Sequence, residues 1–180
     1  MTNESKEKVT ACVQNFHLPR YREIPDVGLY LKQVTKFISD CLAPLETDCI
    51  TDTMISNYVK KDLITNPVKK QYSRDQIGYL IFIAVAKNVL SLEQLRQFIE
   101  LEKGKYEPER AYNYFCDELE NLLEFVFGLK ATPEEIGEST AEEKIMLRSI
   151  IISFSHKIYL EKVLCALKEE PQEEAQAGDE

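Results

Sequence analysis

Most of this chain repeats its apolar residues at the three- and four-residue spacing of an α-helix. The clearest stripes cover residues 27–41, 112–129 and 147–167. Only 6 glycines and 7 prolines interrupt the 180 residues, too few for a β protein with many turns. The pattern therefore predicts a mainly α-helical protein. Its hydrophobic content of 44% is enough for a sizeable core.

The order of elements in the first half is the most informative part of the pattern. We expect helices at about 26–42, 51–61, 73–87 and 91–101, the last two starting with Ser-x-x-Gln capping boxes at Ser73 and Ser91. Between the second and third helices, residues 63–72 hold Asn66-Pro67 between apolar ends. This segment predicts a short hairpin around 66–70, or a tight loop.

Composition divides the chain into four parts. Residues 1–17 are polar and predict a flexible N-terminus, and 18–103 form the first domain. Residues 107–168 form a helical part for dimerisation or effector sensing, followed by an acidic, disordered tail at 169–180. The last long helix is apolar on more than one side, which favours cover from a second subunit and hence a homodimer.

Cysteine and charge usage narrow the class of protein. The five cysteines are scattered and odd in number, which favours reduced thiols in the cytoplasm. No apolar run approaches the ~18 residues of a membrane span, so no membrane partner is expected. The net charge of −9 is uneven: residues 1–105 carry +2 and residues 106–180 carry −11. The first half can therefore meet a polyanion.

Signals for catalysis are weak. His17 and His156 are the two histidines, and the second lies in an apolar helical row typical of a packed residue. The sequence has no Gly-rich phosphate loop, nucleophile elbow or common metal-ligand spacing. We expect a protein that is not an enzyme and that uses no cofactor or metal.

Residues 50–99 resemble the DNA-binding half of MerR-type regulators. Met54-Ile-Ser-Asn-Tyr58 stands where that family has Thr-Ile-Arg-Tyr-Tyr, and Lys60-Lys-Asp-Leu-Ile64 stands where it has a basic-x-Gly-Leu-Ile end. Gln71-Tyr-Ser-Arg-Asp-Gln-Ile77 and Leu90-Ser-Leu-Glu-Gln-Leu-Arg96 match the next two helix starts. Ser56-Asn57 replace the family's Arg-Tyr pair, and Asp62 replaces its glycine. The resemblance implies a winged helix-turn-helix with a short β-hairpin wing.

The chain is similar to the YkrK-like family of Gram-positive bacterial proteins of unknown function, closely over about residues 18–101 and loosely over the acidic half. The similarity rests on Leu18-Pro-Arg-Tyr21, on Tyr30-Leu-Lys-Gln-Val34 and on the MerR-like middle. It implies a regulator of transcription.

The charges and hydrogen-bonding side chains of residues 53–74 favour DNA binding, as the resemblance implies. Five cations and one acid, Asp62, lie in this stretch. Asn57 can pair with adenine, and Ser56 can bind a base or a phosphate. Lysine and arginine can neutralise phosphates. The predicted DNA-binding residues are Thr53, Ser56, Asn57, Lys60, Lys61, Lys69, Lys70, Tyr72 and Arg74.

The sequence thus predicts a transcriptional regulator that binds double-stranded DNA as a homodimer. It leaves open whether a small molecule or a protein is its effector. The alternative is a helical module that binds another protein and no DNA.

Overall fold

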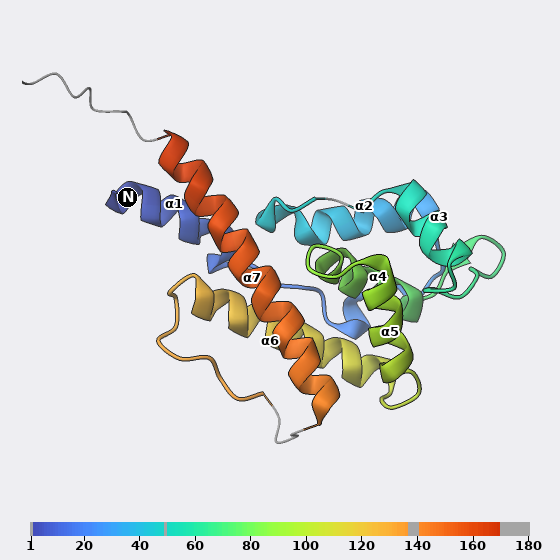
Figure 1. The fold of residues 1–180 in the computed structure, drawn as a ribbon. Coiled ribbons are helices and arrows are strands. Elements are labelled where there is room, and N and C mark those ends of the chain that lie inside the picture. Colours follow the sequence, from blue (N-terminus) through green and yellow to red (C-terminus); the bar gives the residue numbers. More distant parts are fainter. Residues whose placement is uncertain (1, 49, 137–140, 170–180) are drawn as a thin grey trace, which may run out of the picture.

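The computed structural model describes residues 2–48, 50–136 and 141–169 and is mainly helical (Figure 1). Its helices are α1 (Asn3–Gln14), α2 (Leu31–Leu42), α3 (Asp52–Lys60), α4 (Arg74–Ala86), α5 (Leu92–Glu102), α6 (Pro108–Val126) and α7 (Glu142–Glu169). The other elements are the 3₁₀ turns η1 (Tyr21–Glu23) and η2 (Ala43–Leu45) and the strands β1 (Leu29–Tyr30) and β2 (Gln71–Tyr72). None of the described helices is long and apolar enough to cross a membrane.

Helix α4 runs through the middle of the core, as its apolar composition predicts. Ten of its 13 residues are buried. Helices α2, α6 and α7 all contact it, because a helix that is apolar on every side needs neighbours in several directions. A single buried cluster includes residues from α1 to α7. The predicted boundary near residue 104 therefore does not separate two cores in the described chain.

Both predicted capping boxes are present. At the start of α4, the Ser73 amide donates to Gln76 Oε1 at 2.9 Å, and the Gln76 amide donates to Ser73 Oγ at 3.4 Å. At the start of α5, Ser91 and Gln94 make the same pair of hydrogen bonds. Gln76 also donates to the Thr65 carbonyl at 2.7 Å, which ties the preceding loop to α4.

The N-terminal segment differs from the prediction of a flexible stretch over residues 1–17. Residues 3–14 form α1, which packs against α7 and buries Val9 and Val13. Thr2 caps the helix by accepting a hydrogen bond from the Ser5 amide at 3.2 Å. The polar composition of this segment did not predict a packed helix. Two apolar residues four positions apart are nevertheless enough to form one buried face. The predicted tail falls mainly at residues 170–180, outside the described residues.

The helix predicted over residues 26–42 begins at Leu31 instead. The preceding residues Leu29 and Tyr30 form β1, which pairs antiparallel with β2 in the register Leu29–Tyr72 and Tyr30–Gln71. Gly28 allows this pairing, because a Cβ at that position would lie 2.7 Å from the Cβ of Gln71. A residue with a side chain would force the two strands apart there.

An ion-paired cluster attaches the segment before β1 to α6. Arg20 donates to both carboxylate oxygens of Glu120, at 2.7 and 2.8 Å, and contacts Asp117 at 2.9 Å. The Leu18 amide donates to Glu120 at 2.9 Å. Burial alone would raise the pKa of Glu120, but the bonds from Arg20 and the Leu18 amide lower it below its usual value. This cluster joins the first and second halves of the chain.

Candidate functional site

Helix α3 presents a polar face to solvent. Its start is fixed by Thr51, whose hydroxyl accepts a hydrogen bond from the Met54 amide at 3.2 Å. Ile55 and Tyr58 are buried on the opposite side. The predicted contact residues Thr53, Asn57 and Lys60 are exposed, and Ser56 is half-buried. The helix therefore separates a packing face from a face of short polar groups, as predicted.

The C-terminal end of α3 closes in a left-handed turn at Asp62, where φ is 57°. The Lys61 amide donates to the Asn57 carbonyl, and the Leu63 amide reaches back to the Tyr58 carbonyl, both at 2.9 Å. Glycine is the usual residue at this position of a helix, because it carries no Cβ. The glycine that the MerR resemblance implies would occupy this position. Asp62 instead adds a negative charge at the negative end of the helix dipole.

The loop after α3 ends in a two-residue turn. Lys69 and Lys70 both adopt left-handed conformations, with φ of 50° and 66°. The Gln71 amide donates to the Val68 carbonyl at 2.9 Å, and these two residues form a single antiparallel bridge. The hairpin predicted around residues 66–70 is thus reduced to this bridge, and the regular partner of β2 is β1. Strand β2 therefore pairs with a segment about forty residues earlier in the chain, the one that leads into α2.

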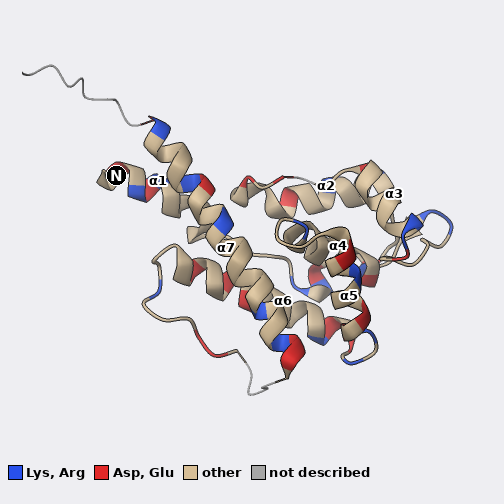
Figure 2. Cartoon of the chain, viewed as in Figure 1, with Lys and Arg blue, Asp and Glu red and all other residues tan. Residues whose placement is uncertain are grey.

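Four cations surround the polar face of α3. Lys60, Lys61, Lys69 and Lys70 are exposed, and none has a carboxylate within 4.0 Å in the described part of the chain. Figure 2 shows the basic tip of the loop beside α3, well away from α1 and the C-terminal end of α7. We name these four residues, with Thr53, Ser56 and Asn57, the α3 surface.

The two remaining predicted contact residues do not join this surface. Tyr72 is buried, with an exposed fraction of 4%, because it pairs with Leu29 inside the strand pair. Arg74 donates from Nε to the Ile24 carbonyl at 2.9 Å, and its guanidinium lies 5.4 Å from the centre of the Tyr21 ring. Both side chains hold the segment before α2 in place. Their partners lie about fifty residues earlier, so local sequence could not place them.

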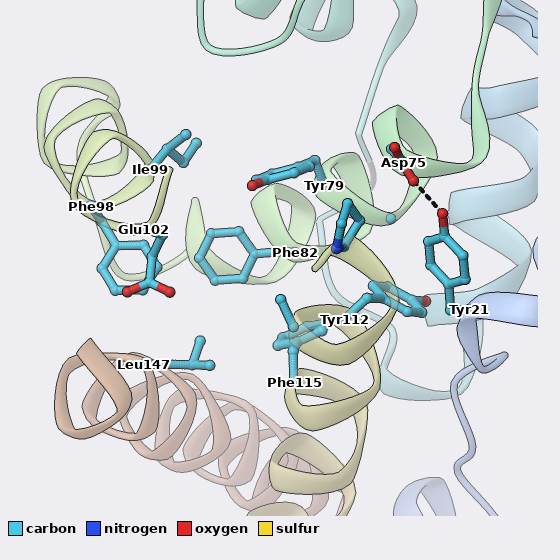
Figure 3. A pocket seen from close by; sticks show the side chains of 13 residues that line it. Tyr21, Asp75, Tyr79, Phe82, Phe98, Ile99, Glu102, Tyr112, Phe115 and Leu147 are labelled. Carbon is cyan, nitrogen blue, oxygen red and sulfur yellow. Dashed lines mark hydrogen bonds between the residues drawn. The ribbon is translucent and has the colours of Figure 1, made fainter. Parts of the chain in front are cut away.

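Sequence reasoning missed a pocket between α4, α5, α6 and α7. Its volume is about 80 Å³, and its walls are mainly aromatic (Figure 3). The Phe82 ring lies 5.5 Å from that of Phe98 and 5.6 Å from that of Phe115. Glu102 and Asp75 lie at opposite ends of the pocket (Figure 3). The apolar residues look like ordinary core positions in the sequence, so no local signal marks them as a pocket wall.

The fold class is mainly α-helical with one small antiparallel strand pair. A family model described as Domain of unknown function (DUF1836) matches residues 19–115, which is more than half of the chain. The chain belongs to this family. The match includes the α3 surface and all the pocket-lining residues except Leu147. No curated protein and no solved structure matches the chain.

Proposed function

We propose that this protein is a transcriptional regulator that binds duplex DNA through the α3 surface, as a winged helix-turn-helix of the MerR-like and YkrK-like kind. The observation that carries the proposal is the set of four exposed lysines near the polar face of α3, none of which forms an ion pair with a described residue. Each lysine can neutralise a backbone phosphate and release its counterions. Asn57 is the exposed amide that would hydrogen-bond a base edge in the major groove.

The side chains of α3 and the lysines of the following turn are placed for two different kinds of DNA contact. A helix in the major groove reads bases, and a flanking turn contacts the backbone. Thr53 and Asn57 lie four residues apart on one side of α3, and Lys60 continues that side. Lys69 and Lys70 occupy the tip of a turn whose base is fixed by β1 and β2. The turn would serve as the wing.

The rest of the molecule would orient the duplex. Residues 106–180 carry a net charge of −11, and the DNA-facing half carries +2. The acidic helices would repel a polyanion and direct it toward the α3 surface.

We also propose that the protein is a homodimer that pairs through α7. Leu160, Leu164 and Leu167 follow one face of this helix and have exposed fractions of 56%, 58% and 44%. Their spacing of four and three residues matches a helix-packing seam. Winged regulators commonly read two half-sites as two-fold dimers.

The second candidate function is a protein-interaction module. Val68 and Tyr30 are large apolar residues with exposed fractions of 75% and 53%, and both pair with Gln71, Tyr30 as part of β1 and Val68 through the isolated bridge. Exposed apolar groups that lie together are typical of protein interfaces. This patch borders the proposed wing, so a DNA assay separates the two candidates.

Fluorescence anisotropy with labelled duplex DNA at several salt concentrations tests the proposal. Lys69→Ala/Lys70→Ala should weaken binding to all sequences and flatten the salt dependence by about 0.9 log unit for each lost phosphate contact. The matched control is Lys6→Ala/Lys8→Ala, which removes the same charge from α1, at the other end of the molecule (Figure 1). Equal losses in the two variants, or no binding by the wild type, would favour the protein-interaction module.

A further inference from the structure

The pocket between α4, α5, α6 and α7 holds a buried carboxylate oxygen with no hydrogen-bond partner among the described residues. Glu102 Oε1 is inaccessible to solvent and makes no hydrogen bond within the described part of the chain. Figure 3 shows Glu102 at the end of the pocket formed by α5, whose lining also includes Phe98. Burial raises the pKa of Glu102, and Lys105 partly offsets this by lowering it. Although Glu102 is only half-buried as a whole, a buried carboxylate oxygen without a hydrogen-bond donor is unfavourable unless a ligand supplies one.

The cations near Glu102 are engaged elsewhere or lie too far away. The Lys105 ammonium binds Glu143. Lys144 lies over the Tyr114 ring, 4.7 Å from its centre. Arg110 lines a neighbouring hollow together with Glu102. No described carboxylate, that of Glu102 included, lies within 4.0 Å of its guanidinium group. Glu102 lines the pocket and is only half-buried as a whole, so its carboxylate is available to an external cation.

The walls of the pocket define the rest of such a ligand. Phe82, Phe98 and Phe115 offer ring faces and edges, and Leu147 adds an aliphatic surface from α7. No lysine or arginine is among the described side chains that line the pocket. The second acid, Asp75, already accepts a hydrogen bond from the Tyr21 hydroxyl. No cation among the described lining side chains would bind an anion, and a neutral apolar molecule would leave Glu102 Oε1 unpaired.

We infer that this pocket binds a small hydrophobic amine, with its apolar group against the phenylalanine rings and its ammonium group on Glu102. The aromatic faces also attract a cation directly. The volume of about 80 Å³ admits a small ligand, part of which remains at the mouth beside the half-exposed Tyr79.

Isothermal titration calorimetry of the full chain with benzylamine tests this assignment. Benzyl alcohol serves as the neutral probe of nearly the same shape. Benzylamine should bind saturably, with a dissociation constant of ~1 mM as expected for so small a ligand. Benzyl alcohol should bind at least about tenfold more weakly, because it leaves the carboxylate without a charge partner.

Variants identify the group responsible. Glu102→Gln should lower benzylamine affinity at least about tenfold while leaving benzyl alcohol binding unchanged, since it removes the charge and keeps the shape. Its melting temperature without ligand should not fall, because the buried Oε1 makes no hydrogen bond in the described part of the chain that the amide would lose. The matched control is Glu100→Gln on the same helix, an exposed residue paired with Lys103 at 3.5 Å, which should bind benzylamine normally.

Equal affinity for the amine and the alcohol would overturn the assignment, as would full benzylamine binding by Glu102→Gln. No DNA is present in this experiment. Its failure is therefore distinguishable from failure of the proposed DNA binding.

Discussion

Replacing Lys69 and Lys70 by Asn and Gly should strengthen the fold and weaken DNA binding at the same time. Both lysines have left-handed backbones, with φ of 50° and 66°. That conformation costs an ordinary residue about 1–2 kcal/mol, and Asn-Gly is the favoured pair for a two-residue hairpin turn. Glycine has more conformational freedom in the unfolded chain, and this subtracts about 0.5–1 kcal/mol from the stabilisation. The gain comes mainly from the glycine position, because Asn still carries a Cβ, so the net stabilisation should be ~1 kcal/mol.

Thermal unfolding should show a melting temperature higher by about 2–4 °C for a chain of this size. The same substitution removes two cations, so the slope of log affinity against log salt should flatten by about 1.8, or about 0.9 for each phosphate contact. A more stable variant with an unchanged salt slope would show that the turn does not contact phosphates. A less stable variant would show that the turn does not have the left-handed geometry on which the reasoning depends.

Three other substitutions test different parts of the account. Asn57→Ala should erode base discrimination by on the order of 1–3 kcal/mol at one position, measured against single-base variants of a selected site, with little change in nonspecific affinity. Leu160→Asp/Leu164→Asp should convert a dimer to the 20.8 kDa monomer in sedimentation equilibrium; a wild-type monomer at micromolar concentration would refute the α7 dimer. Glu120→Gln should lower the free energy of unfolding at pH 7 by about 1.5–3 kcal/mol, because it weakens the bonds from Arg20 and Leu18. The folded pKa of Glu120 is lowered, so this stabilisation is present above about pH 4.3 and is lost as pH falls through the folded pKa; a difference from wild type that persists unchanged in acid would contradict the assigned cause.

Local signals predicted the helices well because capping and periodicity act within a few residues. Ser73 and Ser91 mark the starts of α4 and α5 through hydrogen bonds to Gln76 and Gln94, three residues further on. The strand β1 could not be predicted in this way. Tyr30 continues the apolar spacing of α2, and only the pairing of Leu29 and Tyr30 with β2, about forty residues later, makes the two residues extended.

The same distinction applies to the candidate site. The lysines were placed correctly on an exposed surface, because long cations remain in solvent unless something pairs with them. The sequence predicts Arg74 as a phosphate ligand, because its hydrogen bond to the Ile24 carbonyl and its contact with the Tyr21 ring depend on the tertiary fold. The pocket was missed for the same reason: Phe82, Phe98 and Phe115 come from three helices.

Selection of bound sequences from a random duplex library by the full chain tests the central claim most directly. The account predicts an enriched motif whose two halves are related by two-fold symmetry, as a dimer would read it. Selection with Asn57→Ala should relax the motif at one position in each half. An unenriched library, or a motif that is identical with Asn57→Ala and Lys69→Ala/Lys70→Ala, would contradict DNA recognition by the α3 surface.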